Sequence, residues 1–394
     1  MTRYYFNRIV LSIVCFFVSA VTISLRDAGA EPLRIGGTVS LEGKYTETSA
    51  MIQNGYKLWA KQVNQRGGLL GRPVELVLYD DKSQKDRVGP LYEKLITEDK
   101  VDLILSPYGT PLTLLASQVT ERHGYVMLAC AAAGEKIWER EYEYVFGVYA
   151  LADRYFIGFL DLMARNGLES LGVIFEKTSF NISVAKGARK WADRFGLKVE
   201  YYQGFDDPIK ELPHLLKQVA SRNVDGLIFS GYPPECYQLI GLMKKANYHP
   251  KALSFTIVPV HPDFAKKVGP FAEGIFGPSQ WEPDERIPFP GTAKFIHDFK
   301  AFSGKMPSYH AGSAYSACQI LEKAILQAQA IDHRKIRDFV SSLDTVTVIG
   351  RFKVDHTGRQ VGHNPILIQW QNGKKEIVYP AKMMTAPPRF NLKE

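Results

Sequence analysis

Short runs rich in β-branched residues alternate with amphipathic segments along most of this chain, and that alternation limits its fold more than any other feature. Residues 33–38 form the first strand-like run. In the following segment, 48–65, Ile52, Tyr56 and Trp59 recur at helical spacing. Strands that alternate with helices pair in parallel, because each helix carries the chain back across the sheet. The sequence therefore predicts an α/β fold with parallel sheets.

The alternation runs from residue 33 to residue 130 and starts again at residue 144, which indicates two similar halves. A chain of 394 residues also exceeds the roughly 100–200 residues that one domain usually contains. We therefore expect two doubly wound αβα lobes. After residue 274 the pattern changes to a short strand, two helical segments (292–302 and 311–328) and a β-rich tail from residue 346.

Composition and charge exclude several classes of protein. Hydrophobic residues make up 45% and charged residues 23% of the chain, which are values of a globular protein rather than of a disordered, collagenous or coiled-coil one. Lys and Arg outnumber Asp and Glu by 49 to 41, but the basic residues are scattered and form no stripe or tail. We therefore expect no nucleic-acid partner.

Residues 1–30 differ in kind from the rest and predict a cleaved signal peptide. Arg3 and Arg8 precede an uncharged run at 9–25, and Ala28-Gly29-Ala30 forms a small-residue cleavage site. An uncleaved membrane anchor is the alternative, but the run falls short of the about 20 apolar residues that span a bilayer. We expect a soluble mature protein in the periplasm.

Three cysteines follow the predicted cleavage site: Cys130, Cys236 and Cys318. Each stands in an apolar segment, and no Cys-x-x-Cys spacing occurs. We expect buried free thiols, with one disulfide among the three as the alternative.

Sequence patterns of catalysis are absent or incomplete. The segment from Gly37 to Lys44 has one residue too many for a phosphate-binding loop, and no Gly-x-Ser-x-Gly or zinc-protease histidine pair occurs. Asp80 and Asp81 are interpreted as solvated turn residues, and His310 as a surface or helix-end residue. We therefore expect no catalytic residue, no metal site and no cofactor.

Binding of a small ligand is better supported, because ligands of open parallel sheets lie beyond the carboxyl ends of the strands. There, Tyr108 and Gly109 precede Thr110, a predicted N-cap, and Pro111, a preferred first helical residue. Such a helix start directs free N–H groups at a carboxylate. The alternative, that Thr110 only caps a helix, stays open. The small residues 131–134 also leave backbone amides uncovered for a ligand. The alternative is that this run of alanines only allows tight packing.

Several segments resemble one known family in their order along the chain. They are the first loop 40–43, the stretch 64–71 after the first helix, residues 78–81, the loop 106–110, residues 231–235, residues 272–274 and the helix 314–317. Through them the chain resembles the periplasmic leucine/isoleucine/valine-binding family, the solute receptors of branched-chain amino acid ABC transporters.

The resemblance implies a type I periplasmic binding fold, in which two αβα lobes joined by crossover hinge strands close on a ligand. Lobe 1 would comprise 31–147 and 275–345, and lobe 2 would comprise 148–274 and 346–394. It also implies a monomer whose partners are a small-molecule ligand, an amino acid or another small carboxylate, and an inner-membrane ABC permease.

Transferred by position, the resemblance assigns Thr110 to the ligand carboxylate and Tyr232 to the wall of the pocket, with Tyr45 near an aromatic of the first loop. Three positions depart from the pattern. Ala133 replaces a threonine, Phe180 replaces a tyrosine, and the segment around Ile257 has no acid for an α-ammonium group.

A buried ammonium without a carboxylate partner costs several kcal/mol. The departures therefore predict a ligand other than an ordinary α-amino acid, unless Asp263 or Glu282 supplies the charge.

The resulting hypothesis is a receptor that captures a small carboxylate-bearing ligand, an amino acid or a related organic or aromatic acid, and performs no chemistry. A ligand sensor of the same fold that docks to a membrane receptor, and a two-lobed secreted enzyme, are the alternatives. The predicted ligand-binding residues are Tyr45, Tyr108, Gly109, Thr110, Ala131, Ala133, Phe180, Tyr232, Ile257 and Trp281.

Overall fold

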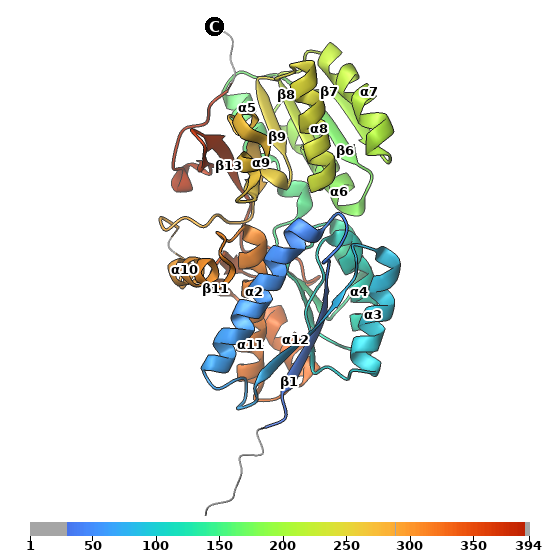
Figure 1. The fold of residues 1–394 in the computed structure, drawn as a ribbon, viewed down its shortest axis with the longest axis vertical. Helices are drawn as coiled ribbons and strands as arrows, with labels where there is room; N and C mark the ends of the chain where they lie inside the picture. The colour runs from blue at the N-terminus through green and yellow to red at the C-terminus, as the bar shows by residue number, and fades with distance from the viewer. Residues whose placement is uncertain (1–29, 288, 391–394) are drawn as a thin grey trace, which may run out of the picture.

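Two sheets with flanking helices form two lobes that follow one another along the long axis of the molecule (Figure 1). The computed structural model describes residues 30–287 and 289–390. The expected signal peptide falls, apart from residue 30, outside this part of the chain. Within the described ranges, no helix is long and apolar enough to cross a membrane.

Lobe 1 contains a three-stranded parallel sheet in the order β2-β1-β3. The next two strands along the chain, β4 and β5, form a short parallel sheet of their own. Its strands are β1 (Leu33–Val39), β2 (Val74–Asp80), β3 (Leu103–Ile104), β4 (Met127–Ala129) and β5 (Val145–Gly147). Its helices are α2 (Thr46–Gln65), α3 (Lys85–Thr97), α4 (Thr110–His123), α10 (Thr292–Ser303), α11 (Tyr309–Ala328) and α12 (His333–Ser342).

Helix α11 packs closely on α2, although about 250 residues separate them in the chain (Figure 1). A glycine permits this contact, because a Cβ atom at Gly55 would lie 2.6 Å from the carbonyl oxygen of Ala311. The core of lobe 1 is therefore completed by a late segment of the sequence.

Lobe 2 contains a seven-stranded sheet in the order β14-β13-β10-β9-β8-β6-β7. The strands β6 to β10 run parallel, and β13 and β14 are antiparallel additions at one edge. The strands are β6 (Ser170–Glu176), β7 (Lys198–Phe205), β8 (Gly226–Ser230), β9 (Ala252–Phe255), β10 (Phe276–Ser279), β13 (Ile366–Gln371) and β14 (Lys374–Tyr379). The helices are α5 (Ile157–Arg165), α6 (Ser179–Arg194), α7 (Pro208–Ser221), α8 (Pro233–Ala246) and α9 (Phe264–Val268). A separate hairpin consists of β11 (Thr345–Thr347) and β12 (Gly350–Phe352).

The predicted α/β fold with two lobes is confirmed, but two expected boundaries are wrong. The sequence assigns residues from 275 onward to lobe 1, whereas β10 pairs with β9 and β13 in the sheet of lobe 2. The chain returns to lobe 1 only after Ser279. The short apolar run of β10 does not itself reveal which sheet it joins, because its main partner β13 lies about 90 residues further on. The sequence also assigns residues from 346 onward to lobe 2, whereas the backbone of Val348 is hydrogen-bonded to Thr292 of α10 and Gln319 of α11 in lobe 1.

Asp81 is buried, contrary to the expectation of a solvated turn. Its carboxylate accepts hydrogen bonds from the hydroxyls of Thr38 (2.8 Å) and Ser40 (2.5 Å) and from the N–H of Ser83 (2.9 Å). These bonds fix the loop after β1. The three cysteines of the described chain are buried and free, as predicted.

Candidate ligand-binding cleft

A small pocket lies between the lobes, at the carboxyl ends of the parallel strands, and its free volume in this closed arrangement is only about 10 Å³. Both lobes contribute to its walls. All predicted ligand-binding residues line it except Tyr45 and Trp281. The lining residues are Tyr108, Gly109, Thr110, Ala131, Ala133, Tyr149, Tyr155, Phe180, Tyr232, Ile257, Tyr309 and His310.

The start of α4 supplies hydrogen-bond donors to the cavity. Gly109 is the N-cap, with φ 82° and ψ 149°, a conformation that favours glycine. Thr110 is therefore the first helical residue and not the cap that the sequence predicted. Its hydroxyl accepts a hydrogen bond from the N–H of Gly134 (3.0 Å) and keeps its own hydrogen available. The N–H of Thr110 also belongs to the first turn, which offers it no intrahelical acceptor.

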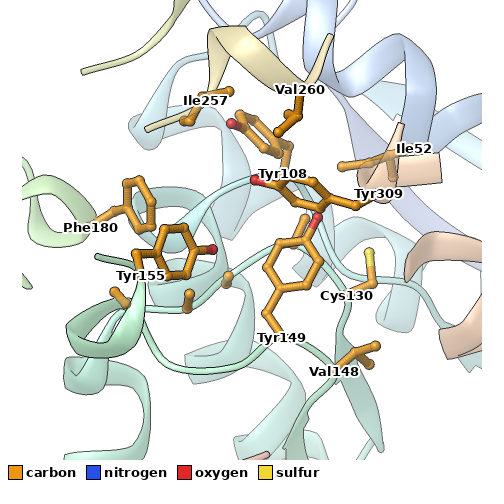
Figure 2. Close-up of a cluster of buried hydrophobic side chains, with 14 of the residues drawn as sticks. Ile52, Tyr108, Cys130, Val148, Tyr149, Tyr155, Phe180, Ile257, Val260 and Tyr309 are labelled. Atoms are coloured by element: carbon orange, nitrogen blue, oxygen red, sulfur yellow. The ribbon is translucent and has the colours of Figure 1, made fainter. Parts of the chain in front are cut away.

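Aromatic rings form most of the wall (Figure 2). Tyr149 packs edge-on against Tyr309, with ring centroids 5.3 Å apart, and Tyr155 packs edge-on against Phe180 at 5.5 Å. Sequence reasoning missed Tyr149, Tyr155 and Tyr309. Tyr149 lies two residues after the end of β5, a strand end that was not considered, whereas Tyr155 lies on the first crossing between the lobes and Tyr309 begins α11.

One tyrosine of the wall has an unused hydroxyl. The oxygen atom of Tyr149 is buried and has no hydrogen-bond partner among the described residues, whereas the hydroxyl of Tyr232 faces that of Tyr45. Burial raises the pKa of both side chains well above the ordinary value, so both remain neutral O–H donors at pH 7. A buried hydroxyl without a protein partner can pair with a water molecule or with a bound ligand.

Two neutral histidines lie beside the tyrosines. His310 lines the cavity and is buried, which corrects its assignment to the surface, although it does lie at a helix start. Its ring stacks on that of His261, 5.5 Å away, and His261 Nε2 lies 3.1 Å from the hydroxyl of Thr48 across the cleft. Burial lowers the pKa of His261 to about 4 and that of His310 well below the ordinary value.

No Asp, Glu, Lys or Arg belongs to the described lining of this cavity. The two acids considered as partners of a ligand ammonium are engaged elsewhere. Asp263 pairs with Lys305 (3.3 Å), and the buried Glu282 pairs with Lys375 and Ser279. Neither carboxylate is therefore placed to neutralise a cation in the cavity.

An ion pair closes the cleft beyond the aromatic wall. Lys44 of lobe 1 lies 2.6 Å from Glu176 and 3.5 Å from Glu235, both of lobe 2. Its ammonium also lies 4.9 Å from the ring centre of Tyr232, against which Tyr45 packs at 4.7 Å. Tyr45 thus forms an outer layer behind Tyr232 rather than part of the described lining. The arrangement corresponds to a closed cleft.

Trp281 is not among the residues that line this cavity. It lines a different hollow, beside the segments that cross between the lobes, and its ring packs against Gly312 and Phe295. Its predicted contact with the ligand is therefore not supported by its position.

Comparison with known proteins agrees with this architecture. The family model described as periplasmic binding protein matches residues 32–375. The Leu/Ile/Val-binding protein homolog 7 of Brucella suis is 22% identical over 386 residues, covering 92% of this chain and 96% of that protein.

Two solved structures share the fold. The substrate binding protein LivJ from Streptococcus pneumoniae in complex with isoleucine superposes with a TM-score of 0.79 at 18% identity, over 89% of this chain and 100% of that one. A solute binding protein of an ABC transporter from R. palustris in complex with benzoate superposes with a TM-score of 0.78 at 19% identity, over 90% of this chain and 97% of that one. The chain belongs to the periplasmic binding protein family.

Proposed function

We propose that this protein captures a small aromatic carboxylic acid between its lobes in the periplasm and delivers it unaltered to an inner-membrane ABC permease. The observation that carries the proposal is the lining of the pocket between the lobes, to which both lobes contribute aromatic side chains but no charged one. A ligand that bridges two lobes stabilises the closed form, and the closed form is what a membrane partner can recognise.

The lining argues against an α-amino acid as the ligand. A buried α-ammonium needs a carboxylate partner, and the described lining provides none. A carboxylate alone can be held by neutral donors, namely the hydroxyl and N–H of Thr110 at the positive end of α4. An acid without an ammonium group therefore fits better.

The aromatic wall favours a ring as the apolar part of the ligand. Tyr149, Phe180 and Tyr309 offer ring faces and edges, and aromatic pairs of this kind are stabilised by about 0.5–1.5 kcal/mol beyond their buried area. The free hydroxyl of Tyr149 can donate to a carboxylate or to a ring hydroxyl. The relative that was solved with benzoate supports this ligand class.

Isothermal titration calorimetry tests the proposal with benzoate, 3-hydroxybenzoate, benzamide and isoleucine. We expect benzoate or its hydroxylated analogue to bind at least ten times more tightly than isoleucine, and benzamide to bind more weakly because it lacks the negative charge. Tighter binding of isoleucine would contradict the ligand class. Mass spectrometry of the released ligand tests whether it leaves unchanged; a chemically altered product would contradict a pure binding function.

A further inference from the structure

A second, larger hollow lies beside the segments that cross between the lobes. We propose that it binds an organic anion with an apolar ring system, and that its affinity for this anion depends on how far the lobes are open. We call it the hinge groove and define it by Arg154, Trp191, Trp281, Phe289, Arg351 and Lys382. Its free volume is about 660 Å³, against about 10 Å³ for the cleft pocket. The described linings of the two have no residue in common.

The hinge groove has an apolar interior. Ile349 and Ile366 are buried at its surface, and the rings of Trp191, Phe289 and Tyr379 stand partly exposed beside them. The indole N–H groups of Trp191 and Trp281 have no acceptor among the described residues. Aromatic walls with a few unused polar groups are typical of ligand sites.

The charge of the groove is positive. Arg154, Arg351 and Lys382 line it, and no Asp or Glu belongs to its described lining. Arg351 is neutralised by Asp344 at 2.5 Å. By contrast, Arg154 contacts only the amide oxygen of Asn364 (3.0 Å), and neither it nor the exposed Lys382 has a carboxylate partner in the described chain. Charge complementarity therefore selects an anion whose ring system enters the groove while its charge stays near Arg154 and Lys382.

The position of the groove couples it to the cleft. Arg154 lines the groove, and the next residue, Tyr155, lines the cleft cavity. Gln280 of the groove accepts a hydrogen bond from the N–H of Ala150 (2.9 Å) on the first crossing between the lobes. A rotation of the lobes therefore moves both sites, and by linkage an anion in the groove and a ligand in the cleft alter each other's affinity.

The probe for the test is 8-anilinonaphthalene-1-sulfonate, whose fluorescence reports an apolar site and which is too large for the cleft pocket of the closed form. We expect one molecule per chain and energy transfer from tryptophan, because Trp191 and Trp281 line the groove. The double variant R154Q/K382Q should bind it about ten times more weakly, and the neutral N-phenyl-1-naphthylamine should bind the wild type more weakly by a similar factor.

A matched control removes two exposed charges of lobe 2 outside the groove, in K217Q/R222Q, and should leave the affinity unchanged. Equal affinity of wild type and R154Q/K382Q, equal affinity for the neutral analogue, or the absence of a stoichiometric site would overturn the proposal. Because the probe is itself an aromatic anion, Thr110→Ala serves as a second control. This variant changes the cleft and not the groove, so it should bind the probe as tightly as the wild type does. Weaker binding of the probe in Thr110→Ala would place the probe in the cleft and overturn the proposal.

The coupling is tested with K44M, which removes the ion pair that closes the cleft but lies outside the groove. We expect the dissociation constant of the probe to change at least threefold in this variant, whereas an unchanged constant would refute the coupling.

Discussion

Replacing Lys44 by methionine should weaken ligand binding without touching the described lining of the cavity. In the closed cleft, the Lys44 side chain is 28% exposed and faces two carboxylates, Glu176 and Glu235, which are 12% and 9% exposed. Burial already raises the pKa of Glu176, and Lys44 opposes that rise. One oxygen of Glu235 has no partner among the described residues. Without the ammonium, closing the lobes would bury two uncompensated acids.

The magnitude follows from the kind of bond lost. A hydrogen bond to a charged group contributes about 1.5–3 kcal/mol, and the partial exposure of Lys44 places it near the lower end. In the open form both acids are hydrated, so the loss falls on the closed form alone. A loss of about 1.5–2 kcal/mol should raise the apparent dissociation constant roughly 10- to 30-fold.

Calorimetry with the tightest-binding acid measures this change, and small-angle X-ray scattering of the ligand-free protein measures the shift toward open lobes. The control is K82M, because Lys82 pairs with Glu42 (3.3 Å) within the same loop region of lobe 1. Adding E176Q to K44M should restore part of the affinity, since it removes one of the two buried charges. An unchanged affinity in K44M, or an equal loss in K82M, would refute the reasoning.

Three further predictions concern the cleft. Thr110→Ala should weaken ligand binding by about 1–3 kcal/mol in calorimetry while Thr110→Ser retains it, and equal affinities would contradict the placement of the carboxylate. Gly109→Ala should lower the free energy of unfolding in urea by about 1–3 kcal/mol, because φ 82° with ψ 149° is strained for any side chain; an unchanged midpoint would count against this. Between pH 6.5 and pH 4 the unfolded chain binds a proton on His261 that the folded chain excludes, so stability should fall as the pH drops, by about 2 kcal/mol at pH 5. His261→Gln should remove that part of the pH dependence in thermal unfolding.

Local patterns were sufficient for the fold class but not for every boundary. The period of apolar residues in 48–65 reflects burial of one helix face, so it predicted α2 well. The start of α4 was predicted within one residue, and the error has a physical reason: glycine adopts the positive φ of the cap position more readily than threonine. The sheet that β10 joins depends on a distant strand and was misjudged.

The cleft was predicted where its residues follow strand ends, as at Thr110 and Tyr232. It was missed where tertiary structure alone brings residues in, as at Tyr309, which lies at the start of a helix late in the chain. The burial of Asp81 was missed for the same reason, because its partner Thr38 lies 43 positions earlier. Such pairings leave no periodic trace in the sequence.

The packing of α11 on α2 has a consequence for the order of assembly. Because Gly55 meets Ala311 across this contact, the amino-terminal half of the chain cannot complete its interior until a segment near residue 311 has been synthesised. Lobe 2 waits longer still, because its edge strands β13 and β14 follow α11 in the chain. A nascent polypeptide would thus carry two unfinished lobes for most of its synthesis, a situation that makes slow maturation and capture by a chaperone physically feasible.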